Sequence, residues 1–496
     1  MNYGQFLNMI PEAMLVLELI ILFVADFCLT HDKEKASKLW LITIGALLVQ
    51  TCMLFGAQPT EAFGGIYITT TMVNTMKVIL TAGTLVVVVM SKTWLDTDKS
   101  LNGQSLNGKY AGEFYMLILS TLLGMYMMMS SGSFLMFFLG LEMASVPMAC
   151  LVAFDKLKKE SAEAAAKYVL VATFSSGVML FGISFVYAAT GSLYYDNVAD
   201  ALHYGFFSLP AGVRSLLIMG LVFFFSGLAF KLSLVPFHFW TADTYQGAPT
   251  PVTGYLSVIS KGAAALTLMI VLNKVFAQMA DFWQPMLWVV IVLSITVANL
   301  FAIRQSELKR FMAFSSISQA GYIMLAVIGA DQQSGAAALM YYVLVYVVAN
   351  MAVFTVISAV EHHGGSTQMS AYNGFYQTNP RLAFLLTLAL FSLAGIPPFA
   401  GMFSKFFVFL AAVDGHTQQP FWSYFVVFIA LINTVVSLYY YLLIVKAMYI
   451  RAEEHPLPAF RTDAPTKLSL AVCTLGIALF GICSFVYDWL HAASAV

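Results

Sequence analysis

Apolar stretches long enough to cross a bilayer recur from one end of the chain to the other. A spanning helix needs about 20 apolar residues to match a hydrocarbon core of about 30 Å. The 496-residue chain holds about fourteen such stretches, the first near Pro11–Leu29 and the last near Lys467–Leu490. The runs are continuous, whereas the strands of a transmembrane β-barrel are short and alternating. The pattern predicts an all-α polytopic membrane protein.

The composition excludes the soluble classes of protein. Hydrophobic residues make up 60% of the chain and charged residues 10%, against about 45–50% and about 25% in soluble domains. A soluble enzyme, a nucleic-acid binder and a disordered scaffold are therefore excluded. The five cysteines form no C-x-x-C pair and the chain has no nucleotide-binding glycine motif, so we expect no cofactor and no metal site in this chain.

The basic residues predict how the helices are oriented. If the N-terminus lies outside, nearly all lysines and arginines of the loops fall on the inner side, and only Arg214 and Lys274 fall on the outer side. Such a bias is the positive-inside pattern of polytopic membrane proteins. It predicts an even number of helices with both termini on the outer side.

Two of the stretches predict broken helices. Arg214–Gln246 and Leu382–Ala411 are too long for one straight span, and both contain internal prolines. They are the seventh and twelfth stretches, and broken helices in corresponding positions are typical of transporters built from inverted repeats. The predicted units are an N-terminal three-helix segment at 1–112, a first repeat of helices 4–8 at 113–275, a second repeat of helices 9–13 at 284–450, and a last helix at 451–496.

Four ionisable residues lie inside predicted spans. A charge at the bilayer centre costs at least about 2.5–3.5 kcal/mol, so residues that carry it usually line a pathway or pair with each other. The four candidates are Glu142, Lys231, Lys261 and Lys405. A lysine held away from water gives up and regains a proton more readily than one in water. A row of such groups, linked by water, predicts proton movement through the membrane.

The sequence around these lysines favours a role inside the membrane over the alternative that their side chains extend to the membrane surface. Pro236 follows Lys231 by five residues and leaves a backbone carbonyl without its helical donor. Lys405 follows a Gly/Pro-rich break, and Lys261 lies near the middle of the eighth stretch beside small residues. A lone carboxylate at the depth of Glu142 would take up a proton, whereas a neighbouring lysine would keep it ionised.

Several other polar residues give weaker predictions. His238 lies near the first break, and two roles are open for it: a proton relay or a structural hydrogen bond. Lys77 lies about one turn inside the third stretch, and we expect it to extend to the surface. Glu18 lies midway along the first stretch and could face a groove or a partner. Asp26 and Glu361 lie at inner helix ends, where we expect them to contact water.

Three segments carry a family resemblance. They are Lys231–Thr253, with the sequence KLSLVPFHFWTADTYQGAPTPVT, then Leu308–Tyr322, and Ala394–Gly401, with the sequence AGIPPFAG. Together with the number of helices, they make essentially the whole chain resemble the antiporter-like membrane subunits of respiratory complex I. The YQGAPTP part is more similar to the N-type subunits of this family than to the L and M subunits or the Mrp antiporter subunits.

The resemblance implies a function and roles for the buried charges. The chain would be a proton-translocating membrane subunit of a bacterial NADH-quinone oxidoreductase, in the inner membrane, beside other antiporter-like and small membrane subunits. Glu142 and Lys231 would form a pair that tunes the lysine, Lys261 would be the central proton carrier, and Lys405 would belong to the exit half-channel. NAD, FMN, iron–sulfur clusters and quinone would be bound by partner subunits, and quinone reduction there would drive the pump.

Three alternatives stay open beside this interpretation. An Mrp-type cation/proton antiporter would use the same lysines and take its energy from an ion gradient, with sodium as a second transported ion. A structural membrane scaffold would gain little from four buried charges. An unrelated solute carrier would need a cluster of polar residues for its solute, which the sequence does not show.

Overall fold

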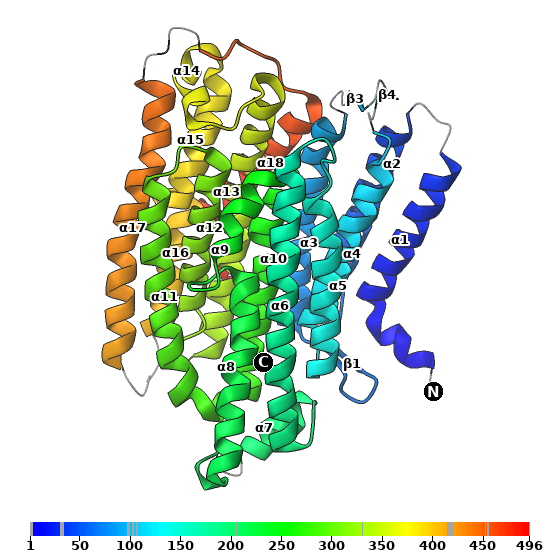
Figure 1. Cartoon of the computed structure of the whole chain (residues 1–496), viewed down its shortest axis with the longest axis vertical. Helices are drawn as coiled ribbons and strands as arrows, with labels where there is room; N and C mark the ends of the chain where they lie inside the picture. The colour runs from blue at the N-terminus through cyan, green and yellow to red at the C-terminus, as the bar shows by residue number, and fades with distance from the viewer. Residues whose placement is uncertain are drawn as a thin grey trace.

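The computed structural model describes residues 3–29, 34–96, 100–101, 104–105, 108–203, 206–329, 331–413, 420–451, 453 and 456–495. Long helices lie side by side in one bundle, and several short helices, the hairpins and most loops lie at its two ends (Figure 1). The predicted all-α polytopic architecture is confirmed.

Twelve helices of the described residues are long and apolar enough to cross a membrane. They are α1 (Ile10–Cys28), α2 (Lys35–Phe55), α3 (Thr71–Leu95), α4 (Ala111–Met129), α5 (Phe134–Val152), α6 (Lys159–Thr190), α8 (Ala211–Leu232), α10 (Thr250–Ile270), α11 (Ala280–Ile303), α13 (Gln332–Gly364), α17 (Pro420–Tyr449) and α18 (Ala464–Ile482).

Two further crossings bring the total to the number predicted from the sequence. One is α12 (Leu308–Leu325), and the other is made of two shorter apolar helices in succession, α15 (Pro380–Ala394) and α16 (Ala400–Val413). Nearly every residue of α12 is buried among other helices. Because α12 faces protein and not lipid, it can carry serines and a glutamine that a lipid-facing helix would not tolerate.

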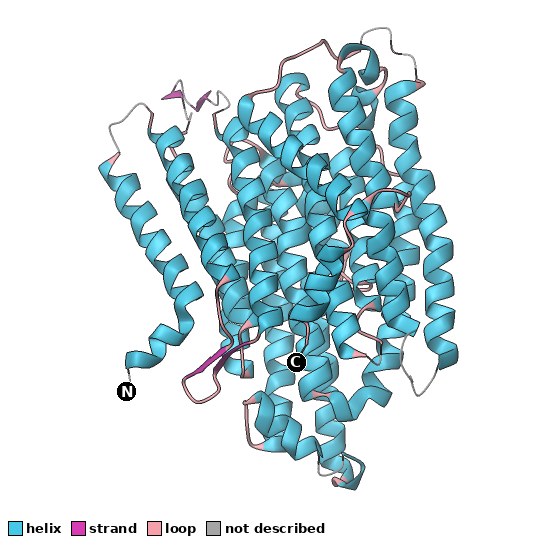
Figure 2. Ribbon diagram, turned by 180° about the vertical axis from the view of Figure 1, so that it is seen from behind, coloured by secondary structure: helices cyan, strands magenta, loops and turns pink. Residues whose placement is uncertain are grey.

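Short elements lie at the two ends of the bundle. β3 (Ser100–Leu101), β4 (Gln104–Ser105) and α14 (Phe375–Thr378) lie at one end, and β1 (Thr60–Ala62) and α7 (Tyr195–His203) lie at the other end, with the N-terminus (Figures 1 and 2). β1 pairs antiparallel with β2 (Tyr67–Thr69). The remaining short elements are η1 (Tyr3–Met9), η2 (Phe206–Ser208), α9 (Phe239–Gly247), the π-helical turn η3 (Val271–Val275), η4 (Ala277–Met279), η5 (Met369–Tyr372) and α19 (Phe485–Ala493).

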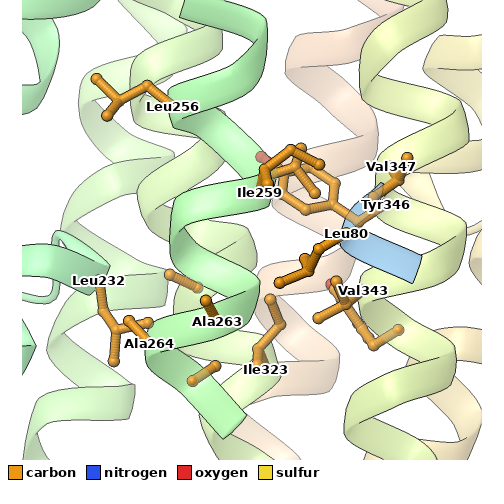
Figure 3. Close-up of a cluster of buried hydrophobic side chains, with 14 of the residues drawn as sticks. Leu80, Leu232, Leu256, Ile259, Ala263, Ala264, Ile323, Val343, Tyr346 and Val347 are labelled. Atoms are coloured by element: carbon orange, nitrogen blue, oxygen red, sulfur yellow. The ribbon is translucent and has the colours of Figure 1, made fainter. Parts of the chain in front are cut away.

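The helices α10 and α13 form the centre of the bundle. In each of them 94% of the most apolar stretch is buried, against 28% in α1, α2 and α18, which lie at the outside. Side chains of neighbouring helices pack on α10, among them Leu80 of α3, Ile323 of α12 and Val343 of α13 (Figure 3). Ile259 and Ala263 in this cluster lie two residues before and two residues after Lys261, so this lysine lies at the level of the cluster.

Both predicted breaks are present. The helix α8 ends at Leu232 and α9 begins at Phe239; α15 ends at Ala394 and α16 begins at Ala400. Backbone angles of the left-handed type end the first half-helix in each case, at Ser233 (φ 62°) and Gly395 (φ 88°).

The half-helix after each break packs on the long helix that precedes the broken pair, α9 on α6 and α16 on α13. This shared packing agrees with two related units, and because five helices is an odd number, the second unit runs inverted. The unit boundaries at 1–112, 113–275, 284–450 and 451–496 stay a prediction.

Candidate functional site

The three lysines predicted inside the membrane are all buried. Lys231 on α8, Lys261 on α10 and Lys405 on α16 have exposed fractions of 4%, 1% and 4%. No ion pair joins any of them to a carboxylate of the described residues, although other lysines of the chain form such pairs. Each is instead held by a neutral oxygen.

Lys231 binds a hydroxyl of α5. Its Nζ donates a 2.9 Å hydrogen bond to Oγ of Ser145. Glu142, one turn earlier on α5, is half-buried and has no ion pair or hydrogen bond with Lys231 among the described residues. Ser145, three residues further along the same helix face, makes the direct contact with Lys231, and the tuning of Lys231 by Glu142 stays a prediction. We missed Ser145 in the sequence, although its spacing from Glu142 was a usable signal.

Lys261 binds a hydroxyl of α12. Its Nζ lies 2.7 Å from Oγ of Ser316 and 5.7 Å from the centre of the Tyr245 ring. The same Ser316 hydroxyl donates to the Ser257 carbonyl at 3.2 Å, and Nδ2 of Asn350 donates to the Ser257 hydroxyl at 2.5 Å. Polar groups of α10, α12 and α13 thus meet at the central lysine.

Lys405 reaches back across its own break. Its Nζ donates a 2.9 Å hydrogen bond to the carbonyl of Ala394, the last residue of α15, and lies 5.0 Å from the centre of the Tyr322 ring. The last carbonyls of a helix have no partner within it, so the break creates the acceptor that the lysine uses. At the other break, Nε1 of Trp240 donates to the carbonyl of Phe230, two residues before the end of α8, at 3.1 Å.

A glutamine on α12 lies between the regions of Lys261 and Lys405. Gln319 is one turn from Ser316, and its Nε2 lies 3.2 Å from the Leu393 carbonyl and 3.2 Å from the Tyr441 hydroxyl. Its Oε1 accepts a hydrogen bond from Tyr342. A small cavity with room for about one water molecule is lined by Gln319, Tyr342, Tyr346, Ser392, Ser404 and Lys405.

The sequence analysis did not single out Ser316, which contacts Lys261, or Gln319, which lines the cavity at Lys405. The signal was present, since Ser315, Ser316 and Gln319 recur at helical spacing in an otherwise apolar stretch.

The predictions for two of the weaker candidates, His238 and Lys77, have mixed outcomes. His238 lies in the first break, is 8% exposed, and its Nδ1 has no partner among the described residues. No hydrogen bond joins it to the three lysines in the part of the chain that the structure describes. The prediction that Lys77 extends to the surface is wrong. It is fully buried and forms a 2.7 Å ion pair with Glu12, because α1 and the β1–β2 hairpin cover that end of α3.

The two acidic residues at inner helix ends are less wetted than expected. The side chain of Glu361 is only 17% exposed, lies 3.0 Å from Nζ of Lys158 and accepts a hydrogen bond from Thr250. Asp26 is 25% exposed and pairs with Lys35 at 2.9 Å. Among the described residues, no group of three or more His, Cys, Asp or Glu could hold a metal ion.

Comparisons with known proteins concern the chain and its fold as a whole. Residues 131–437 match the family model described as "NADH:quinone oxidoreductase/Mrp antiporter, TM". The chain is 54% identical to the NADH-quinone oxidoreductase subunit N of Phocaeicola vulgatus over 99% of both chains.

Solved structures share the fold. A chain of respiratory complex I from Thermus thermophilus is 29% identical, with a TM-score of 0.75 over 95% of this chain and 97% of that chain. A chain of the Mrp complex from Dietzia sp. has a TM-score of 0.81 at 16% identity over 99% and 97% of the two chains, which shows a shared fold alone. The chain belongs to the subunit N family of the NADH-quinone oxidoreductases, within the wider family of antiporter-like membrane subunits.

Proposed function

We propose that this chain is a proton-translocating membrane subunit of a NADH-quinone oxidoreductase. The observation that carries the proposal is the set of three buried lysines, each held by a neutral oxygen and none paired with a carboxylate among the described residues. A lysine bound in this way can exist with or without its proton, whereas a lysine in a buried ion pair is fixed in its charged form.

In the proposed mechanism, protons move between these lysines over hydroxyl and amide groups and enclosed water. Lys261 is the central carrier, and Ser316 is its contact on α12. Gln319 continues the polar row toward the cavity at Lys405, which forms the exit side. Glu142 acts on Lys231 through its charge, so that a change in the protonation of one residue alters the proton affinity of the other. His238 is a candidate relay at the first break.

The energy comes from partner subunits in this proposal. NAD, FMN, iron–sulfur clusters and quinone are bound there, and this chain contributes no redox centre to the translocase. Its direct partners are other antiporter-like and small membrane subunits and the surrounding lipid of the bacterial inner membrane, with both termini on the outer side. The basic loops gathered at one end of the bundle support this orientation.

The test uses the complete assembly reconstituted in sealed vesicles. Lys261→Ala should abolish proton pumping and lower quinone reduction, with the assembly intact. Lys274→Ala is the matched control, since Lys274 is 43% exposed and pairs with Asp196 on the surface. Unchanged pumping in Lys261→Ala would contradict the central role.

A gradient-driven Mrp-type antiporter is the second candidate, supported by the shared fold with the Mrp chain. The two functions differ in their energy source. If NADH oxidation drives proton uptake that Lys261→Ala removes, the redox-driven pump is supported. If the purified assembly carries no reducible iron–sulfur clusters and exchanges sodium for protons, the antiporter is supported instead.

A further inference from the structure

The helix α1 presents two carboxylates to the interior of the protein. Its buried residues are Pro11, Glu12, Leu15, Glu18 and Leu22, which recur every three or four positions and form one face. This face packs on α2 and α4, while the rest of α1 is largely exposed and apolar. An apolar face would be sufficient for packing, so the two carboxylates need another explanation.

The first carboxylate is fully partnered. Oε1 of Glu12 lies 2.7 Å from Nζ of Lys77 and 3.3 Å from the Ser130 hydroxyl, and Oε2 accepts a 2.7 Å hydrogen bond from the Tyr67 hydroxyl. Lys77 also lies between the rings of Tyr67 and Tyr126, at 5.6 and 5.3 Å from their centres. The negative charge of Glu12 is therefore balanced by the positive charge of Lys77.

The second carboxylate is buried without a partner. Glu18 is 4% exposed, and neither of its oxygens has a hydrogen-bond partner among the described residues. A bare carboxylate in apolar surroundings carries a large solvation penalty, whereas a protonated carboxyl does not. Six residues separate it from Glu12, which is about 9 Å along the helix.

The titratable and charged groups of the neighbouring helices leave Glu18 without a cation. From α4, Tyr126 lies near both carboxylates and near Gln50. From α3, the charged group at this end is Lys77, already paired. The helix α2 runs antiparallel to α1, with Gln50 bonded to the Pro11 carbonyl, and its basic residues lie in its first turn at the other end of α1. No positive charge therefore remains to balance Glu18 within the described residues.

A cavity of about 230 Å³ lies at the end of the bundle that carries the N-terminus, and its lining includes Pro11, the residue before Glu12. Its lining includes polar side chains of Asn8, Gln58, Thr60, Thr69 and Asn74. Asn74 is one turn from Lys77 on α3, and its Oδ1 has no partner among the described residues. The cavity is large enough for several water molecules, so water can come within one turn of the Glu12–Lys77 pair.

We propose that Glu18 is a proton-binding site, loaded from this cavity through the level of Asn74 and the Glu12–Lys77 pair. On loading, hydronium in the cavity gives up one proton and becomes water, and the Glu18 carboxylate becomes a carboxyl; release is the reverse. The site lies in the N-terminal three-helix segment, outside both antiporter-like units, and it does not depend on the function proposed above.

The test is infrared spectroscopy of the complete assembly, which detects a protonated carboxyl by its C=O stretch. The spectrum of Glu18→Gln should lose one protonated-carboxyl band that the unmodified assembly shows at neutral pH and loses at alkaline pH. Glu113→Gln is the matched control, because Glu113 is exposed at the start of α4 and should contribute no such band. If Glu18→Gln does not assemble, Glu18→Asp should shift the band.

The route is tested by transfer of sealed vesicles into deuterated water. Asn74→Leu should slow the isotope shift of the Glu18 band, because it closes the wall of the cavity nearest the pair. An isotope shift of the Glu18 band that is equally fast in Asn74→Leu and in the unmodified assembly would overturn the loading route. Absence of a carboxyl band that depends on Glu18, or its displacement by sodium at constant pH, would overturn the proton site itself.

Discussion

Lys158 and Glu361 form a 3.0 Å ion pair that connects the start of α6 to the end of α13. Thr250, in the first turn of α10, also bonds to Glu361. This ion pair therefore joins the two predicted units, at the end of the bundle that carries the basic loops.

This ion pair gives a prediction about pH. Burial lowers the pKa of Lys158, but the combined attraction of Glu361, Asp155 and Glu160 outweighs burial and leaves the pKa above its ordinary value. The contribution to stability is therefore fully present below the ordinary lysine pKa of about 10.4 and is lost as pH rises through the raised pKa. Because Lys158 is half-exposed, its removal should cost about 0–1 kcal/mol.

The measurement is the thermal midpoint of the assembly with Lys158→Met. The midpoint should be lower than that of the unmodified assembly at neutral pH, and the difference should vanish in strongly alkaline buffer. Lys159→Met is the control, since Lys159 is exposed and has no ion pair in the described part of the chain. A difference that persists unchanged at alkaline pH would show that packing and not charge is responsible.

The contact between Lys231 and Ser145 predicts a graded series. Lys231→Arg keeps the positive charge and can still donate to the Ser145 hydroxyl, so it should pump more protons than Lys231→Ala. Proton pumping by reconstituted assemblies measures the difference. Equal losses in the two variants would mean that Lys231 must release its proton, because arginine cannot.

Gln319→Leu should interrupt the polar row between Lys261 and Lys405. The substitution leaves the Tyr342 and Tyr441 hydroxyls without their amide partner. Each increase of about 1.4 kcal/mol in the barrier slows proton transfer about tenfold. Pumping should fall by about that factor while the level of assembled complex stays the same. Gln305→Leu, near a helix end, should pump normally, and a normal rate in Gln319→Leu would exclude this route.

The second break depends on a glycine in the first turn of α16. A Cβ atom at Gly401 would lie 1.6 Å from the backbone carbonyl oxygen of Ser392, so Gly401→Ala must push α16 away from α15. We expect a loss of about 1–3 kcal/mol in stability, together with reduced pumping because Lys405 moves with α16. Gly45→Ala is the control, with nothing within 4 Å of the added atom. An unchanged thermal midpoint would contradict the packing described here.

The spans and both breaks could be predicted because they depend on local sequence. Hydropathy identifies spans, and proline with glycine marks the places where a helix cannot continue. The helix α12 shows the limit of this reasoning, since its low hydropathy is tolerated only because other helices surround it. Its crossing followed from the alternation of basic loops as much as from its own residues.

The partners of the buried charges could not be predicted in the same way. Lys77 and Glu12 are 65 positions apart, and Lys231 and Ser145 are 86 apart. Which residue of a distant helix faces a given lysine depends on helix rotation and packing, which one sequence does not specify. A lysine near the end of an apolar stretch therefore gave the same signal whether it reached the surface or, like Lys77, was covered by α1.

The hydrogen bond from Lys405 to Ala394 makes the joint between α15 and α16 sensitive to the occupancy of a single proton. A charged donor forms a bond about twice as strong as a neutral one. With its proton in place, the ammonium clamps the two half-helices together. Without the proton this hydrogen bond weakens. Under the proposed function, the joint between the two half-helices would therefore stiffen and loosen with each proton that Lys405 binds and releases.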